Sequence, residues 1–347
     1  MSSAERLPEM RLHFAFGPRY ALFSLASVGA LVALATMPQL LGEQVTEAFH
    51  GLLDISPGWL WLAASSFAAA LAASGCAWRS ALCRCGGDLT RADASARYGV
   101  GSLVNAFLPA KVGSAVRFAL FAQVLRGEAR LWTTGGVCAS IGAARSVWLG
   151  LLLAFAVVGG VLPVWPLALL TLGVLVALAV AVFARNRAPH ARVAHVLDVF
   201  RALARSPRAA AQLVGWIGLA ASARVGAATA IAAAFGVERP LLAALLVVPA
   251  LDLAGVLPLT PGNIGVASAA VAFALHAHGA TTQTAISAGI AFSAVETVTS
   301  VAFGIGSGLF LATTAPGARR WTATAAATTA CLVLVAAFGA TVVLPLV

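Results

Sequence analysis

Charged residues are scarce in this chain, and lysine is almost absent. Only 10% of the 347 residues are charged, and Lys111 is the single lysine beside 21 arginines. A soluble globular domain carries much more charge, so this composition excludes one. We also expect no nucleic-acid partner.

Signatures of catalysis and of metal binding are missing as well. The sequence contains no GxxxxGK[ST], HExxH or GxSxG motif. Cys83 and Cys85 are two of only five cysteines, and no second pair or nearby histidine completes a four-ligand zinc site around them. We therefore expect no catalytic residues, no metal and no cofactor, and we do not expect an enzyme.

Apolar residues, in contrast, are abundant. They make up 61% of the chain, and the mean hydropathy is +0.94. Apolar runs of about 20 residues are long enough to cross a bilayer as helices. We predict an all-α polytopic membrane protein, with residues 1–347 forming a single integral membrane domain. About seven full spans are expected, at 20–41, 58–78, 131–158, 164–184, 209–235, 283–312 and 321–345.

The arginines predict the topology. Seventeen of the 22 basic residues lie in the segments 1–19, 79–97, 126–130, 185–208 and 319–320. Basic loops stay in the cytoplasm, so we expect the N-terminus and the basic loop 185–208 on that side. The C-terminus should lie outside. The expected location is the cytoplasmic membrane of a bacterium.

A Leu-Pro-x-x-x-Gly signature occurs twice, as LPAKVG from Leu108 and LPLTPG from Leu257, with the two prolines 149 residues apart. Proline and glycine break helices, and broken backbone is tolerated in a bilayer only where protein or water surrounds it. Paired breaks of this kind indicate the working site of a transporter built from repeats. The residues expected to shape the two tips and their gate are Pro109, Gly113, Pro258, Pro261, Gly262 and Gly265.

The basic loops on either side of 95–125 can share the cytoplasm only if this stretch enters the membrane and returns. We predict a re-entrant helical hairpin there, and a second one, entering from the opposite face, at 240–279. The two halves, 58–158 and 209–312, would then be an inverted repeat whose tips meet near the midplane. The alternative is that each predicted hairpin is one bent span.

Six charges fall at membrane depth: Lys111, Arg117, Arg145, Arg224, Asp252 and Glu296. Each costs roughly 2.5–3.5 kcal/mol at the centre of an inserted helix unless it is paired or hydrated. Four bases and two acids leave an excess of two positive charges, which an anion would balance. Helix N-termini near both tips would add hydrogen-bond donors, so a phosphate suits the site.

These six residues do not carry equal weight. Arg117 lies one helical turn beyond Gly113, and Arg145 is in the middle of a span, so we favour these two as the phosphate-binding pair. Lys111 and Arg224 are substrate-binding candidates too, although each is as readily explained as an anchor whose charge reaches the surface. Asp252 and Glu296 are interpreted as counter-ions rather than proton carriers.

The pattern around the two signatures resembles a known family. Asn105 precedes the first motif, Arg117 follows it, Arg145 lies in the next span, and Pro258-x-x-Pro261-Gly-Asn-Ile-Gly265 forms the second motif. Together they resemble the flippase-like membrane domain of lysylphosphatidylglycerol synthases, over roughly 20–345. The resemblance implies movement of lipids or polyprenyl-linked precursors across the bilayer. The synthases append an aminoacyl-transferase domain, which we do not find before Val347.

The chain departs from the pattern typical of that family at several positions. Ser114, Ala144 and Ser268 stand where relatives often have acids, and Asn263 replaces a glycine. The loss of three acids makes the site more positive and argues against acid-mediated proton coupling. Glu296 lies near a position that is often arginine in relatives, so Arg145 and Glu296 could form an ion pair of their own.

We therefore predict translocation of an anionic lipid, a phospholipid or a polyprenyl phosphate, with Asn105, Ser114 and Asn263 lining the site beside the arginines. One alternative is transport of a small soluble anion. Another is a non-transporting subunit that presents lipid to a glycosyltransferase or another lipid-modifying enzyme. The sequence does not identify the headgroup, the energy source, the direction of transport or the oligomeric state.

Overall fold

The computed structural model describes residues 56–107, 112–160, 162–186, 191–255 and 264–312. These residues form ten α-helices and one 3-10 turn and contain no β-strand. The helices are α3 (Pro57–Leu82), α4 (Arg91–Phe107), α5 (Val112–Ala122), α6 (Arg130–Val158), α7 (Trp165–Asn186), α8 (Ala191–Ala204), α9 (Pro207–Ala234), α10 (Pro240–Ala254), α11 (Ile264–Ala277) and α12 (Thr282–Ala312), and the turn η1 is Cys83–Cys85. The expected all-α class is confirmed.

Local sequence explains where several helices start. Proline occupies the first turn of α3, α9 and α10, where its missing N–H costs no hydrogen bond. At the start of α4, the Thr90 hydroxyl accepts a hydrogen bond from the Asp93 N–H and donates one to the Asp93 carboxylate. This reciprocal cap fixes the first turn of α4.

Four helices are long and apolar enough to cross a membrane: α3 extended through η1, α6, α9 and α12. They correspond to four of the seven predicted spans. The described apolar part of α7, Trp165–Val176, is shorter than a span, and the predicted spans 20–41 and 321–345 lie outside the described residues. The chain is thus a multi-pass membrane protein.

The described helices follow one order twice. A long helix, two short helices and a long helix make up α3 to α6, and the same order returns in α9 to α12. The short helices have 17, 11, 15 and 14 residues. At 1.5 Å per residue none is longer than about 26 Å, whereas the apolar core of a bilayer is about 30 Å thick.

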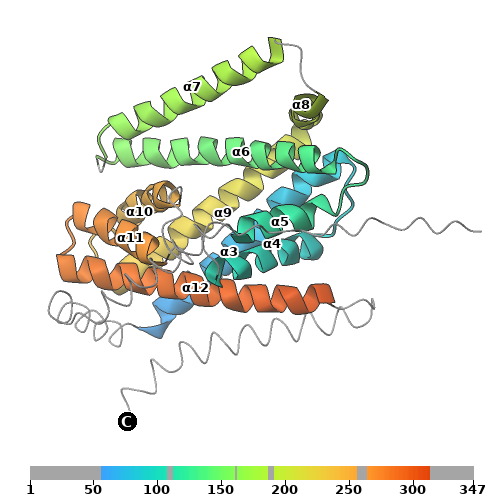
Figure 1. Ribbon diagram of the computed structural model, residues 1–347. Coiled ribbons are helices and arrows are strands. Elements are labelled where there is room, and N and C mark those ends of the chain that lie inside the picture. The colour runs from blue at the N-terminus through green and yellow to red at the C-terminus, as the bar shows by residue number, and fades with distance from the viewer. Residues whose placement is uncertain (1–55, 108–111, 161, 187–190, 256–263, 313–347) are drawn as a thin grey trace, which may run out of the picture.

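Helix packing repeats in the same way. The contacts α3–α4, α4–α5 and α5–α6 match α9–α10, α10–α11 and α11–α12. Between the halves, α4–α12 matches α10–α6, and α3–α12 matches α9–α6, while α3 packs along α9. Figure 1 shows α6 and α12 on opposite sides of the α3–α9 pair and running in opposite directions.

Small residues bring the central helices together. Ala63 and Ala64 of α3 and Ala227 and Ala228 of α9 are almost fully buried in one cluster. Close backbone approach of this kind is the usual basis of helix association in membranes. Phe67 of α3 then packs edge-to-face against Phe292 of α12, with ring centroids 5.0 Å apart.

The basic segment 185–208 differs from the loop that we expected, because α8 occupies most of it. Val199 and Leu203 are buried, and the backbone of Gly136 in α6 lies against Val199. Their spacing places Val196, Val199 and Leu203 on one helical face, which is apolar although arginines surround it in sequence.

Candidate functional site

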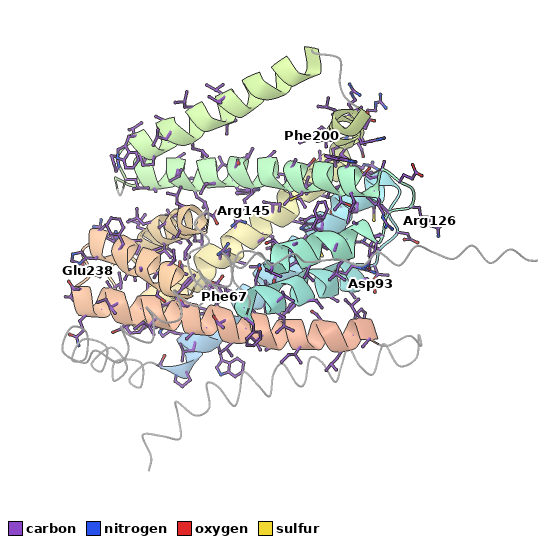
Figure 2. The ribbon with its side chains drawn as sticks, viewed as in Figure 1. Phe67, Asp93, Arg126, Arg145, Phe200 and Glu238 are labelled. Carbon is purple, nitrogen blue, oxygen red and sulfur yellow. The ribbon has the colours of Figure 1, made fainter. Side chains whose placement is uncertain are left out.

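Four of the charged residues at membrane depth form one ion-pair network. Arg145 of α6 donates a hydrogen bond to the Asp252 carboxylate of α10. The Arg224 guanidinium of α9 lies 3.6 Å from the same Asp252 oxygen, and 3.4 Å from a Glu296 carboxylate oxygen of α12. Figure 2 shows Arg145 between α6 and α10. Asp252 therefore forms ion pairs with two arginines, and its contact with Arg145 connects the two halves of the fold.

The network bears on two possibilities that the sequence left open. Arg145 pairs with Asp252 and not with Glu296. Arg224 does not extend alone toward the surface, because two carboxylates hold it and only 26% of its side chain is exposed. The network contains two bases and two acids, so its formal charge is zero. The side chains of Asp252 and Arg145 are 16% and 53% exposed, so the pair has a partly buried acid and a half-exposed base.

Arg117 of α5 has a different environment. Its guanidinium carbon lies 3.7 Å from the centre of the Tyr98 ring, and one terminal nitrogen donates a hydrogen bond of 3.2 Å to the Ser102 hydroxyl. The Arg117 Nε is buried and has no hydrogen-bond partner among the described residues. In the part of the chain that the structure describes, no carboxylate lies within ion-pair distance of Arg117. Its charge lies against a π face and a hydroxyl, and no described carboxylate neutralises it.

Glycines bring α5 close enough to α4 for this contact. A methyl group on Gly113 would overlap the Gly101 carbonyl oxygen, and one on Gly101 would lie 2.8 Å from Arg117 Cβ. The two backbones are therefore in direct contact just beyond the first motif. Arg97 ties the other end of the pair, since it donates a 2.7 Å hydrogen bond to the Leu120 carbonyl near the end of α5.

The remaining predicted site residues are placed as follows. Asn105 lies two residues before the end of α4, and its side-chain oxygen is buried without a hydrogen-bond partner in the described structure. Ser114 is exposed in the first turn of α5, and Gly265 lies in the first turn of α11. Residues outside the described ranges are Pro109, Lys111, Pro258, Pro261, Gly262 and Asn263.

Sequence reasoning missed Tyr98 and Ser102. Both face Arg117, and with Asn105 they follow the spacing i, i+4, i+7 on one side of α4. Tyr98 is one of only two tyrosines in the chain, so polar side chains recurring at helical spacing ahead of the first motif were the signal that could have revealed them. Among the described residues, no group of three histidine, cysteine or carboxylate side chains is arranged to hold a metal ion.

Comparison with known proteins agrees with this architecture. The family model of the lysylphosphatidylglycerol synthase TM region matches residues 21–304, which is most of the chain. The chain belongs to this family. The match to the lysylphosphatidylglycerol synthase TM region includes α3 to α6, α9 to α11 and all four residues of the ion-pair network. The family links this membrane domain to lipid handling. No curated protein matches the chain.

Proposed function

We propose that this protein translocates an anionic lipid across the cytoplasmic membrane of a bacterium, and that Arg117 binds the lipid phosphate. The observation that carries the proposal is the state of Arg117, a cation in the membrane domain with no carboxylate partner in the described structure and with an unpaired, buried Nε–H. A charge at this depth is stabilised when an anion binds to it. A guanidinium offers two parallel donors that match the oxygens of a phosphate.

The ion-pair network supports different roles for the arginines. Arg145 and Arg224 are balanced by Asp252 and Glu296, so they do not require a ligand for neutrality. Of the two arginines favoured from the sequence, Arg117 is the better phosphate ligand. The Arg145 side chain is half exposed and forms an ion pair with Asp252. We assign Arg145 a second, weaker role, in which it binds the phosphate only when the phosphate displaces the Asp252 carboxylate.

The four short helices α4, α5, α10 and α11 would form the path of the lipid headgroup through the membrane. In this proposal α4 with α5, and α10 with α11, are re-entrant hairpins whose tips gate the midplane. Their lengths support this, because no arm is long enough to cross the bilayer. The headgroup would move along the polar side of α4, from Tyr98 past Ser102 to Asn105, while the hydrocarbon tails stay in the bilayer. No bond is made or broken.

The first test is lipid translocation in proteoliposomes that contain fluorescent phosphatidylglycerol. Wild type should expose the inner-leaflet label to an external quencher faster than empty liposomes do. Arg117→Ala should lower this rate about tenfold or more, since a charge-assisted hydrogen bond contributes about 1.5–3 kcal/mol. Arg117→Lys keeps the charge without the planar donor pair, so it should recover only part of the rate.

Arg84→Ala is the matched control, because Arg84 is exposed in the turn η1 and lies outside the site. It should translocate lipid as wild type does. A folded Arg117→Ala variant with the wild-type rate would refute the assignment of Arg117. If folded wild type does not accelerate any phospholipid or polyprenyl phosphate, transport itself is refuted, and the lipid-presenting subunit becomes the better explanation.

A further inference from the structure

A pocket of about 360 Å³ lies between α3, the start of α4 and α9. Its lining consists of Arg79, Ser80, Arg91, Gln212, Gly215, Trp216 and Leu219. Arg91 is the first residue of α4, and Tyr98, which contacts Arg117, lies seven residues further along the same helix, or about 10 Å at 1.5 Å per residue. The pocket lining includes none of Tyr98, Ser102, Asn105 and Arg117, so the pocket consists of other residues than the proposed translocation site.

Two arginines give the pocket its charge. Arg79 uses its Nε–H to donate a 2.7 Å hydrogen bond to the Leu89 carbonyl, which fixes the guanidinium and leaves its terminal nitrogens available. Arg91 lies over the Trp216 ring, with its guanidinium carbon 5.7 Å from the ring centre. No carboxylate of the described residues forms an ion pair with either arginine. Within the described part of the chain, the pocket thus holds two positive charges without a carboxylate partner.

The other side of the pocket is apolar. A Cβ atom built on Gly215 would meet no atom within 4 Å, so this glycine leaves an open notch in the surface of α9. Leu219 is one turn further along α9, and 49% of it is exposed. Trp216 stands between the two zones, and tryptophan is the residue type typical of the boundary between headgroups and acyl chains.

We propose that this pocket binds one anionic phospholipid, with the phosphate held by Arg79 and Arg91 and an acyl chain lying over Gly215 and Leu219. A free anion would use the two arginines and leave the apolar notch without a partner. A lipid satisfies both halves of the pocket at once. The same charge balance favours phosphatidylglycerol over phosphatidylcholine, because the choline group of the latter cancels the phosphate charge.

The test is native mass spectrometry of the full chain, released from detergent micelles that contain dioleoyl phosphatidylglycerol or dioleoyl phosphatidylcholine. Wild type should retain one phosphatidylglycerol with clear preference over phosphatidylcholine. The double variant Arg79→Gln/Arg91→Gln should bind it at least tenfold more weakly. Gly215→Leu fills the notch without removing charge, and it should weaken binding by a similar factor.

The matched control is Arg84→Gln/Arg126→Gln, which removes two exposed arginines that do not line the pocket and should bind as wild type does. Arg117→Ala should also keep this lipid, so a failure here and a failure of the translocation proposal can be told apart. Wild-type binding in folded Gly215→Leu, or in folded Arg91→Gln together with Arg79→Gln, would overturn the proposal. Displacement of the lipid by millimolar inorganic phosphate would overturn the lipid as the ligand.

Discussion

At the scale of residues, the described intramembrane charges separate into a neutral group and one uncompensated cation. Asp252 is the centre of the neutral group, because it contacts both Arg145 and Arg224. Among the described residues, Glu296 forms an ion pair only with Arg224. Removing either acid therefore has different consequences: loss of Asp252 leaves Arg145 without a partner, whereas loss of Glu296 leaves Arg224 with Asp252.

We expect Asp252→Asn to lower the free energy of unfolding by about 2–3 kcal/mol. Breaking a buried ion pair costs about 3–5 kcal/mol, and the half-exposed side chain of Arg145 reduces that penalty through solvent screening. Glu296→Gln should cost less. Thermal unfolding in detergent, followed by circular dichroism, would measure both changes.

Asp198→Asn is the control for this prediction. Asp198 pairs with Arg201 at 2.9 Å on α8, and both side chains are more than half exposed. Exposed pairs contribute about 0–1 kcal/mol, so this variant should unfold close to wild type. Equal stability of Asp252→Asn and Asp198→Asn would show that the network does not support the fold.

At the scale of elements, the contact between α4 and α5 decides where the charge of Arg117 lies. Gly101 and Gly113 let the two backbones touch, and the Arg117 side chain passes against Gly101 on its way to Tyr98. Any side chain at either glycine would separate the helices and move the guanidinium. The position of the cation is therefore a consequence of helix packing.

We predict that Gly113→Ala lowers stability by about 1–3 kcal/mol and slows lipid translocation, because the added methyl group overlaps the Gly101 carbonyl oxygen. The unfolding midpoint and the proteoliposome rate would both report this change. Gly135→Ala in α6 is the control, since a Cβ there meets nothing within 4 Å. It should be neutral or stabilising by up to about 1 kcal/mol. Identical behaviour of the two variants would contradict close packing of α4 on α5.

At the scale of the whole molecule, the repeated packing order of the two halves and the distribution of arginines predict which end of the molecule faces the cytoplasm. Figure 2 shows Arg126 and Glu238 at opposite ends, and both residues are exposed. Arg126 belongs to a basic segment and Glu238 to the loop before α10. They are suitable positions for testing orientation.

In a variant without the native cysteines, we expect Glu238→Cys to react with a membrane-impermeant maleimide added to intact cells. Arg126→Cys should react only after the membrane is permeabilised, because the positive-inside rule places it in the cytoplasm. Labelling yields on a gel would give the result. Reaction of both positions from outside would place both ends of the molecule on one side and contradict the inverted repeat.

The sequence by itself determined the class of the protein and the order of its parts. Apolar runs are local in the chain, so the long helices α3, α6, α9 and α12 follow from composition and length. The first Leu-Pro-x-x-x-Gly signature begins just after α4 and ends in α5, and the second falls between the end of α10 and the start of α11, because proline and glycine together disfavour a continuous helix. The helix α8 was missed because its apolar face is only three residues wide in a basic segment.

Only the tertiary structure decided which charges neutralise one another. Arg145 and Asp252 are 107 residues apart in sequence, and Arg224 and Glu296 are 72 apart. Counting the charged residues at membrane depth predicted an excess of two positive charges. The count could not show which bases carry this excess, because ion pairing depends on how helices from the two halves pack. In the fold, Asp252 and Glu296 pair with Arg145 and Arg224, whereas Arg117 contacts Tyr98 and Ser102. An ion pair forms between side chains that are close in space, and spacing along the chain does not fix that distance.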